Sequence, residues 1–393
     1  MRRRPGIWPA SAAVASAWAA LYTVVQWVSL YVSAPIHDDV RLCYVAAEAG
    51  LRYGWSTIYD EATLRALSSG FPESTRFIDT KTTFASTPFL AWAFAPLTAF
   101  PEPVAYAIWV ALSVAALAVA WRLTAPYGGL ARATLLLLAV GLWPVLLTLY
   151  FGQPTLIVAG AIATAWWLSK RDEPVYAGLA LAVATALKPQ AVLLLPAALL
   201  VGGRFRVVAA WACAMAVLAV IAALALGSSG LIGWWHAVKG IQALSVNTTF
   251  TLAGPLGTGP LTYALWIVEG AAALWIAWAR RRELEIVFAA GILGTVATAT
   301  YFHNSDYAVL VVAAWLVLRT SPPQWQRAWL AAGIIPMQLL LTPVGAAPQL
   351  AWDAAWLAIL AIQALPALHA KAVPAEVVVT ARRADEAAGR IGL

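Results

Sequence analysis

Charged side chains are scarce in this chain of 393 residues, because Asp, Glu, Lys and Arg together make up only 11% of it. Soluble domains usually carry about 25% charged residues. The hydrophobic fraction is 62% and the mean hydropathy is +0.77. No soluble fold of this length could bury so much apolar side chain, so lipid must surround most of the surface. The 21 Trp fit this reading, since indole rings favour the membrane–water interface.

Cysteine is also scarce, and several functional motifs are missing. Cys43 and Cys213 lie far apart, so they suggest neither a disulfide framework nor a metal site. The sequence has no Gly-rich phosphate loop, zinc signature or nucleophile elbow. We therefore predict no metal and no cofactor. The net charge of +7 does not indicate a nucleic-acid partner, because the basic residues are scattered between apolar runs instead of forming one face.

Long hydrophobic runs recur to the end of the chain. The first run follows three arginines, is longer than a signal-peptide core and lacks an obvious small-residue cleavage site, so we expect it to be retained as a span. We predict an all-α, polytopic transmembrane bundle with about twelve spans, several of them short. The expected spans are 8–32, 104–122, 133–151, 154–169, 175–187, 189–203, 206–226, 258–279, 285–302, 306–318, 328–345 and 350–369.

The distribution of Lys and Arg predicts the orientation. The N-terminal arginines place that end in the cytoplasm, and the basic turns near residues 170, 204, 280 and 319 then fall on the same side. These spans form one membrane domain over residues 1–370, and residues 371–393 form a cytoplasmic tail.

One further apolar run, 84–100, decides whether this orientation is consistent. A full crossing there would move every later basic turn outside, so we expect a re-entrant or interfacial helix that Pro101-Glu102-Pro103 turns back. The alternative is that 84–100 crosses and that two later short runs are fused.

The first extracytoplasmic loop, residues 33–83, is the most polar part of the chain. Within it, 46–51 and 61–67 carry apolar residues three and four positions apart, which predicts helices lying along the membrane surface.

Polar residues are concentrated in the turns predicted to lie outside, whereas the inside turns hold mostly Arg, Gly and Pro. Such groups at the ends of apolar helices are costly and persist mainly where they face a cavity. The sequence therefore predicts one polar site at the outer face. The turns are His37-Asp38-Asp39, Gly152-Gln153, Lys188-Pro189-Gln190, Asn247-Thr248-Thr249 and His303-Asn304-Ser305-Asp306.

Each candidate also has a simpler explanation. Asp39 follows the first span and could be a general base, or it could only cap the next helix; spacing does not separate it from Asp38. Lys188 could bind a phosphate as a point charge, or it could reach toward the interface as lysines often do. His303 and Asp306 could hold a leaving phosphate or an acceptor hydroxyl, although a loop histidine is often merely solvated.

Two more polar residues have ambiguous roles. Asn247 opens a glycosylation sequon, a short pattern that also arises by chance, and a polar turn lining the cavity explains it equally well. Glu269 falls inside an apolar run, so it should face the bundle interior and pair there.

With these residues in place, the chain resembles glycosyltransferase family 87 of the GT-C superfamily, which includes polyprenol-phosphate-mannose-dependent mannosyltransferases. The resemblance runs from about Pro35 to Asp306, and the order and spacing of its segments make it specific. The family often has an aromatic residue where this chain has Thr87, and the last polar turn departs from the family pattern. The matching segments are Asp39-Val40-Arg41-Leu42-Cys43-Tyr44-Val45-Ala46-Ala47, Gly54, Ile58-Tyr59-Asp60, Thr87-Pro88, Ala95-Pro96-Leu97, Gly152-Gln153, Ala177-Gly178, Leu187-Lys188-Pro189-Gln190 and Asn247.

The resemblance implies a membrane glycosyltransferase that moves a sugar, with mannose expected, from a polyprenyl-phosphate donor to an acceptor hydroxyl with inversion. Asp39 would be the general base. Lys188 and His303, with Arg41, would stabilise the departing lipid phosphate. The residues expected to bind substrate are Asp38, Arg41, Tyr44, Gln153, Lys188, Gln190, Asn247, His303 and Asp306.

The implied setting is a bacterial plasma membrane, with the active site on the extracytoplasmic side. The partners would be the lipid bilayer, the lipid-linked donor and a glycolipid or glycan acceptor, and arabinose or another pentose is an alternative sugar. A transporter or lipid flippase is the alternative function, although such a protein should place its polar residues near the bilayer midplane on broken, repeated helices.

Overall fold

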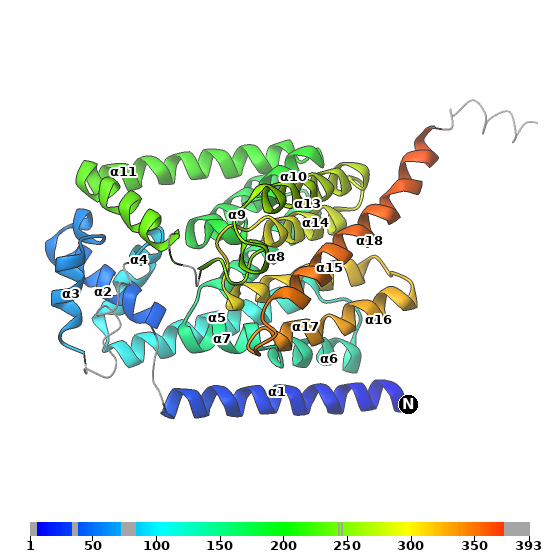
Figure 1. The fold of residues 1–393 in the computed structure, drawn as a ribbon, viewed down its shortest axis with the longest axis horizontal. Coiled ribbons are helices and arrows are strands. Elements are labelled where there is room, and N and C mark those ends of the chain that lie inside the picture. The colour runs from blue at the N-terminus through cyan, green and yellow to red at the C-terminus, as the bar shows by residue number, and fades with distance from the viewer. Residues whose placement is uncertain (1–5, 34–37, 72–83, 243, 245–246, 373–393) are drawn as a thin grey trace, which may run out of the picture.

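The computed structural model describes residues 6–33, 38–71, 84–242, 244 and 247–372, without the side chains of Asp38 and 366–372. Within these residues the protein is helical and has no strand. Most of the long helices run along one direction, and the N-terminus lies at one end of this bundle (Figure 1).

The helices follow one another along the chain with mostly short connections. In chain order they are α1 (Ile7–Ser33), α2 (Asp38–Tyr53), η1 (Trp55–Thr57), α3 (Glu61–Ser68), α4 (Pro88–Phe94), η4 (Ala95–Ala99), α5 (Glu102–Thr124), α6 (Gly129–Val140), α7 (Trp143–Phe151), α8 (Thr155–Lys170), α9 (Pro174–Leu187), η5 (Pro189–Ala191), α10 (Leu195–Val201), α11 (Phe205–Gln242), α12 (Ala253–Leu256), α13 (Pro260–Ala279), α14 (Leu284–Ala297), η7 (Asn304–Val309), α15 (Leu310–Arg319), α16 (Gln324–Ala332), α17 (Ile334–Leu339) and α18 (Ala347–Ala372).

Fewer helices than expected can cross a membrane on their own. Among the described residues, α1, α5, α11 and α13 are long and apolar enough, and the pair α6 and α7, bent by 58°, would make a fifth. The expectation of about twelve spans is therefore not confirmed.

Three of the expected spans are broken in the structure. The run 133–151 is divided at Gly141 into α6 and α7, and 328–345 is divided into α16 and α17. The run 189–203 becomes η5 and the seven-residue α10, each with a proline in its first turn. Proline lacks the N–H that a continuous helix would need at these positions.

The segment predicted to re-enter is a short, irregular helix. A seven-residue α4 is followed directly by the five-residue 3₁₀ helix η4. Together they extend about 20 Å, whereas the hydrocarbon core is about 30 Å thick. The Thr87 hydroxyl donates a hydrogen bond to the carbonyl of Ala186, which ties the start of α4 to the end of α9. Its placement relative to the bilayer stays a prediction.

The first loop contains the two helices expected there. α2 is longer than the predicted 46–51, and α3 nearly coincides with 61–67. Asp60 caps α3 by accepting a hydrogen bond from the backbone N–H of Thr63 at 2.9 Å. Residues 72–83 of this loop lie outside the described part of the chain.

The core has two main parts. The larger lies around α14, which is buried at every position from Leu284 to Ala297 except Glu285. The smaller joins α2 and α4 to the first turns of α5 and the second half of α11. Gly227, at φ 61°, bends α11 so that its second half covers the first loop. Glu269 on α13 is half-buried, and its Oε2 has no hydrogen-bond partner among the described residues.

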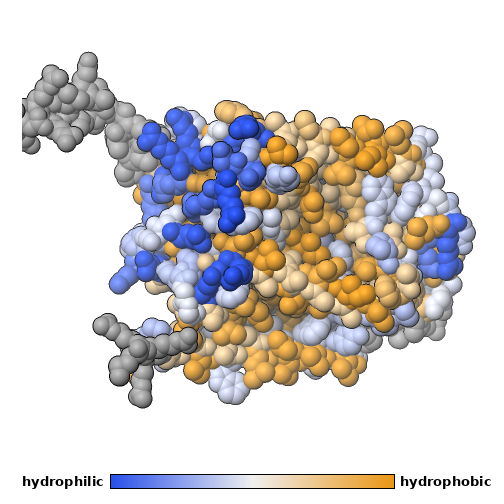
Figure 2. Space-filling view, turned by 180° about the vertical axis from the view of Figure 1, so that it is seen from behind, coloured by the Kyte–Doolittle hydropathy of each residue, from blue (hydrophilic) through white to orange (hydrophobic). Residues whose placement is uncertain are grey.

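Apolar and polar residues occupy separate parts of the surface, as their separate runs in the sequence predict. Figure 2 shows a broad hydrophobic belt, with hydrophilic residues gathered mainly at the end where α1 begins and α18 ends. The bundle therefore has the polarity expected of a membrane domain.

Candidate functional site

A close contact between α2 and the turn after α7 positions Asp39. Val40 is fully buried and packs against Gly152, where a Cβ atom would lie only 2.0 Å from Val40 Cγ2. Gly152 also has a left-handed backbone, with φ of 73°, that ends α7. The indole N–H of Trp109 donates to the Gly152 carbonyl at 2.8 Å. Glycine is thus required at position 152 for two reasons, the positive φ and the close approach of Val40. This contact brings Asp39 beside Gln153.

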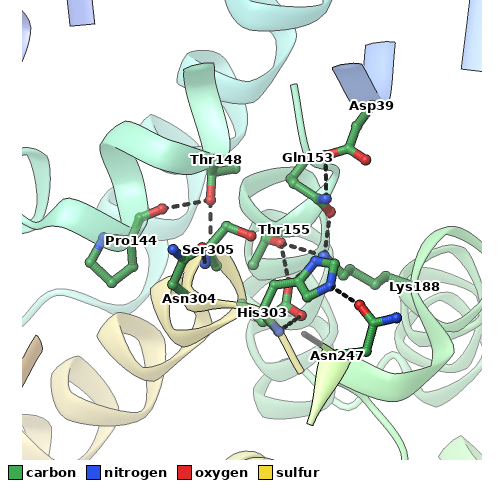
Figure 3. A network of polar contacts seen from close by, with 11 residues as sticks. Asp39, Pro144, Thr148, Gln153, Thr155, Lys188, Asn247, His303, Asn304 and Ser305 are labelled. Carbon is green, nitrogen blue, oxygen red and sulfur yellow. Dashed lines mark hydrogen bonds and ion pairs between the residues drawn. The ribbon is translucent and has the colours of Figure 1, made fainter. Parts of the chain in front are cut away.

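Gln153 connects Asp39 to Lys188. Its amide Nε2 donates to Asp39 Oδ2 at 2.5 Å, and its Oε1 accepts from Lys188 Nζ at 2.5 Å (Figure 3). A side-chain amide has one donor end and one acceptor end. The carboxylate and the ammonium therefore fix its orientation, and the side chain of Gln153 is buried between them.

Lys188 and Asp306 form a buried ion pair, with the two side chains 4% and 0% exposed. The Thr155 hydroxyl accepts from Lys188 Nζ at 3.1 Å and donates to Asp306 Oδ1 at 3.1 Å. An ammonium group has three donors, and here they face Gln153, Thr155 and Asp306. This group joins the end of α9, the start of α8 and the first turn of η7.

His303 completes the network on its other side. The backbone N–H of His303 donates to Asp306 Oδ2 at 2.9 Å. Its ring Nε2 lies 2.8 Å from Asn247 Oδ1, and Asn247 Nδ2 donates to the carbonyl of Ile241 at 2.6 Å. Because an amide oxygen only accepts, His303 Nε2 must carry the proton. The ring itself is half-buried beside Tyr301, with centroids 5.0 Å apart.

The two carboxyl groups of the network differ in proton affinity. Burial raises the pKa of Asp39 above its ordinary value, and the charges of His303 and Lys188 with the Gln153 hydrogen bond offset this only in part. Burial also acts to raise the pKa of Asp306, but Lys188, His303 and their hydrogen bonds outweigh it, so that pKa is lowered. Asp39 therefore has the higher proton affinity of the two, and Asp306 the lower.

Six of the predicted site residues thus meet in one network, although they come from distant segments. They are Asp39, Gln153, Lys188, Asn247, His303 and Asp306.

Three of the other predicted residues lie outside this network. Arg41 forms a salt bridge with Glu102 at 3.7 Å, and its guanidinium lies over Phe71. The Tyr44 hydroxyl donates to the carbonyl of Phe100 at 2.9 Å. Gln190 is half-buried in η5 without a side-chain hydrogen bond to any described residue. Asp38 begins α2, and its side chain is outside the described part.

Sequence reasoning missed two residues that contact predicted site residues. Thr155 looked like part of an apolar run, although its place directly after Gln153-Pro154 was a usable signal. Glu102 was assigned only to a turn, yet it is buried against Arg41. The described residues contain no cluster of three His, Cys, Asp or Glu side chains that could hold a metal ion.

The comparison with family models identifies the protein's family. The model of glycosyltransferase family 87 matches residues 84–302, which is more than half of the chain. The chain belongs to glycosyltransferase family 87. No curated protein and no solved structure matches it.

Membership of this family makes the protein a glycosyltransferase, with a sugar donor and an acceptor as its substrates. Gln153, Lys188 and Asn247 lie inside the matched segment, and His303 and Asp306 follow it directly. Asp39 precedes it by many residues. The hydrogen bond to Gln153 is what connects Asp39 to the part of the chain that shows the family.

The buried ion pair predicts a non-additive effect on stability. Lys188→Met leaves Asp306 buried without its counter-charge and should lower the free energy of unfolding by about 3–5 kcal/mol. Adding Asp306→Asn should restore much of that loss, since no buried charge remains. Thermal or denaturant unfolding of the purified variants measures this cycle. Additive losses would contradict the pairing.

The contact at Gly152 predicts a different loss. Gly152→Ala would strain the left-handed turn and push against Val40, so α2 should shift and separate Asp39 from Gln153. We expect transfer activity to fall much more than the loss of folded protein explains. Gly203→Ala is a matched control, because Gly203 also has a positive φ, of 78°, but has open space around its Cβ position. Equal losses in both variants would contradict the positioning role of Gly152.

Proposed function

We propose that this glycosyltransferase moves a sugar, with mannose expected, from a polyprenyl-phosphate donor to an acceptor hydroxyl with inversion of configuration. The observation that carries the proposal is the hydrogen-bonded path from Asp39 through Gln153 to the buried pair of Lys188 and Asp306. It sets a proton acceptor beside a fixed cationic group, which are the two functions that sugar transfer from a lipid phosphate requires.

Asp39 is proposed as the general base. Its side chain is half-buried, so one face can meet a substrate while Gln153 holds the other. The acceptor hydroxyl would give its proton to Asp39 while its oxygen attacks the anomeric carbon. The bond from that carbon to the donor phosphate breaks, and the phosphate leaves with the bonding electrons. Attack opposite the leaving group inverts the configuration, which would give an alpha-mannoside from a beta-linked donor.

Lys188 and His303 are proposed to meet the departing phosphate. The Lys188 ammonium contacts Asp306, Gln153 and the neutral hydroxyl of Thr155. A phosphate oxygen could take the place of the Thr155 hydroxyl while the contacts with Asp306 and Gln153 remain. The half-buried ring of His303 offers a second donor when protonated. Fixed donors aimed at developing charge are among the largest contributions to catalysis. Arg41, paired with Glu102, would add positive potential from further away.

The site is proposed to face the extracytoplasmic side of a bacterial plasma membrane, as in the GT-C arrangement. Thr155 of the site begins α8, whereas Lys170 ends the same helix and borders one cavity with the basic turns of Arg122 and Arg319. The positive-inside rule assigns those basic turns to the cytoplasm. The polar groups gather at helix ends and turns instead of in the middle of long helices, which supports an enzyme over a transporter. The acceptor would be a glycolipid or a glycan.

Replacing Asp39 tests the base directly. In membranes supplied with labelled polyprenyl-phosphate mannose, Asp39→Asn should lower the transfer rate by about 10²–10⁴-fold, because the amide takes no proton. Asp60→Asn, which alters an exposed helix cap in the same loop, should remain close to wild type. Full activity of Asp39→Asn at normal expression would refute the role of Asp39. Strict dependence on a nucleotide sugar would refute the donor.

The raised pKa of Asp39 predicts the pH profile. The base works when deprotonated, so the transfer rate should fall as pH drops through a pKa that lies above the ordinary carboxyl value. Gln153→Leu removes a hydrogen bond that favours the ionised form and should move this acidic limb to higher pH. Gln326→Leu, which alters a buried glutamine paired with Gln363, should leave the limb in place. An unmoved limb in Gln153→Leu would contradict the coupling.

A further inference from the structure

The end of the bundle opposite Asp39 contains a strongly basic cavity. Its volume is about 690 Å³, and it lies where α5 meets α6, where α8 ends and where α15 ends. The hydrophilic end of the molecule in Figure 2 is the same end, where α1 begins. Five cationic side chains border the cavity: Arg122, Arg132, Lys170, Arg171 and Arg319.

Most of this charge is not neutralised within the described structure. Lys170 forms a salt bridge with Glu285, but no described acidic side chain forms one with the four arginines, although Asp172 and Glu173 directly follow Arg171. Indole rings support three of these arginines instead. The distances from guanidinium carbon to ring centroid are 4.0 Å for Arg171 over Trp167, 4.9 Å for Arg319 over Trp166 and 5.1 Å for Arg132 over Trp121.

The hydrogen bonding of this cavity is also incomplete. Trp166 is 1% exposed and lines the cavity, yet its indole N–H has no hydrogen-bond partner among the described residues. The Nε of Arg132 also has no hydrogen-bond partner among the described residues, whereas its Nη2 donates to the carbonyls of Trp121 and Arg122. The main indication of an anion site is the group of held, unneutralised cations around this cavity.

An apolar cavity of about 400 Å³ adjoins the basic one, and the two share Tyr127 and Leu318 in their walls. Its lining runs along α15 from Leu310 to Leu318 and includes residues of α6, α16, α17 and α18. The volume is within the range of about 300–1,000 Å³ typical of ligand pockets. A cationic compartment beside an apolar one matches a molecule that has an anionic head and a hydrocarbon tail.

We propose that this pair of cavities binds an anionic phospholipid, with its phosphate among the arginines and one acyl chain in the apolar cavity. Basic pockets between membrane helices on the cytoplasmic side suit anionic head groups. A soluble anion would not account for the adjoining apolar cavity. The donor of the transfer reaction does not fit either, because its phosphate must reach the opposite end of the bundle. The lipid would hold together α8 and α15, the helices whose other ends adjoin Thr155 and Asp306.

The test compares two lipids with identical acyl chains on the purified, full-length protein in detergent. Phosphatidylglycerol should bind about tenfold more tightly than phosphatidylcholine by native mass spectrometry, and it alone should raise the Tm. The double variant Arg122→Gln/Arg171→Gln should remove most of that preference. The double variant Arg281→Gln/Arg282→Gln removes the same number of positive charges from exposed arginines outside the cavity. It should retain the preference for phosphatidylglycerol.

A second variant tests the apolar compartment without altering charge. Ala314→Phe fills part of that cavity and should weaken phosphatidylglycerol binding while leaving the salt dependence of the remaining binding unchanged. Equal binding of the two lipids, or equal loss in both arginine double variants, would overturn the proposal. Competition by inorganic phosphate alone as strong as that by the lipid would show a soluble-anion site instead. None of these readouts depends on sugar transfer, so they stand apart from the proposed function.

Discussion

The buried ion pair between Lys188 and Asp306 is the interaction on which the site depends. A lysine ammonium placed among apolar helices is tolerated only when its counter-charge and hydrogen bonds are supplied. Here Asp306, Thr155 and Gln153 supply them, and together with Lys188 they come from three different turns. Satisfying one charge therefore brings these turns together and orients the Gln153 amide. Only then does Gln153 present its donor end to Asp39.

Close packing of small residues makes this convergence possible. Gly152 lets α2 approach the turn after α7, and Gly160 lets α8 lie against α5, where a Cβ would meet the Ala116 carbonyl at 2.9 Å. Gly227 bends α11 over the first loop. In membranes, helices associate through such close contacts because lipid is as apolar as the side chains. The first loop is thereby fixed to the bundle, and its aspartate becomes part of a site built mainly by later segments.

Much of this arrangement could be predicted from sequence, and the exceptions have physical causes. The periodic placement of polar turns between apolar runs identified Asp39, Gln153, Lys188, Asn247, His303 and Asp306 as residues at one end of the bundle. Sequence could not show that Gln153 lies between two charges, because that depends on the contact of Val40 with Gly152. Nor could it resolve the spans. Hydropathy measures only composition, so it does not detect that Gly141, Pro189 and Pro196 break runs that are apolar throughout. It also does not separate helices that face lipid from buried helices such as α14.

The two ends of the molecule now have distinct chemistry: a compact, hydrogen-bonded polar network at one end and an unneutralised basic cavity at the other. The most direct test of the account is an experimental structure of the Asp39→Asn enzyme with a polyprenyl-phosphate mannose donor bound. The account predicts the anomeric carbon beside residue 39 and the phosphate within hydrogen-bonding distance of His303 and Lys188. A donor phosphate bound among the arginines at the opposite end, or away from residue 39, would contradict it.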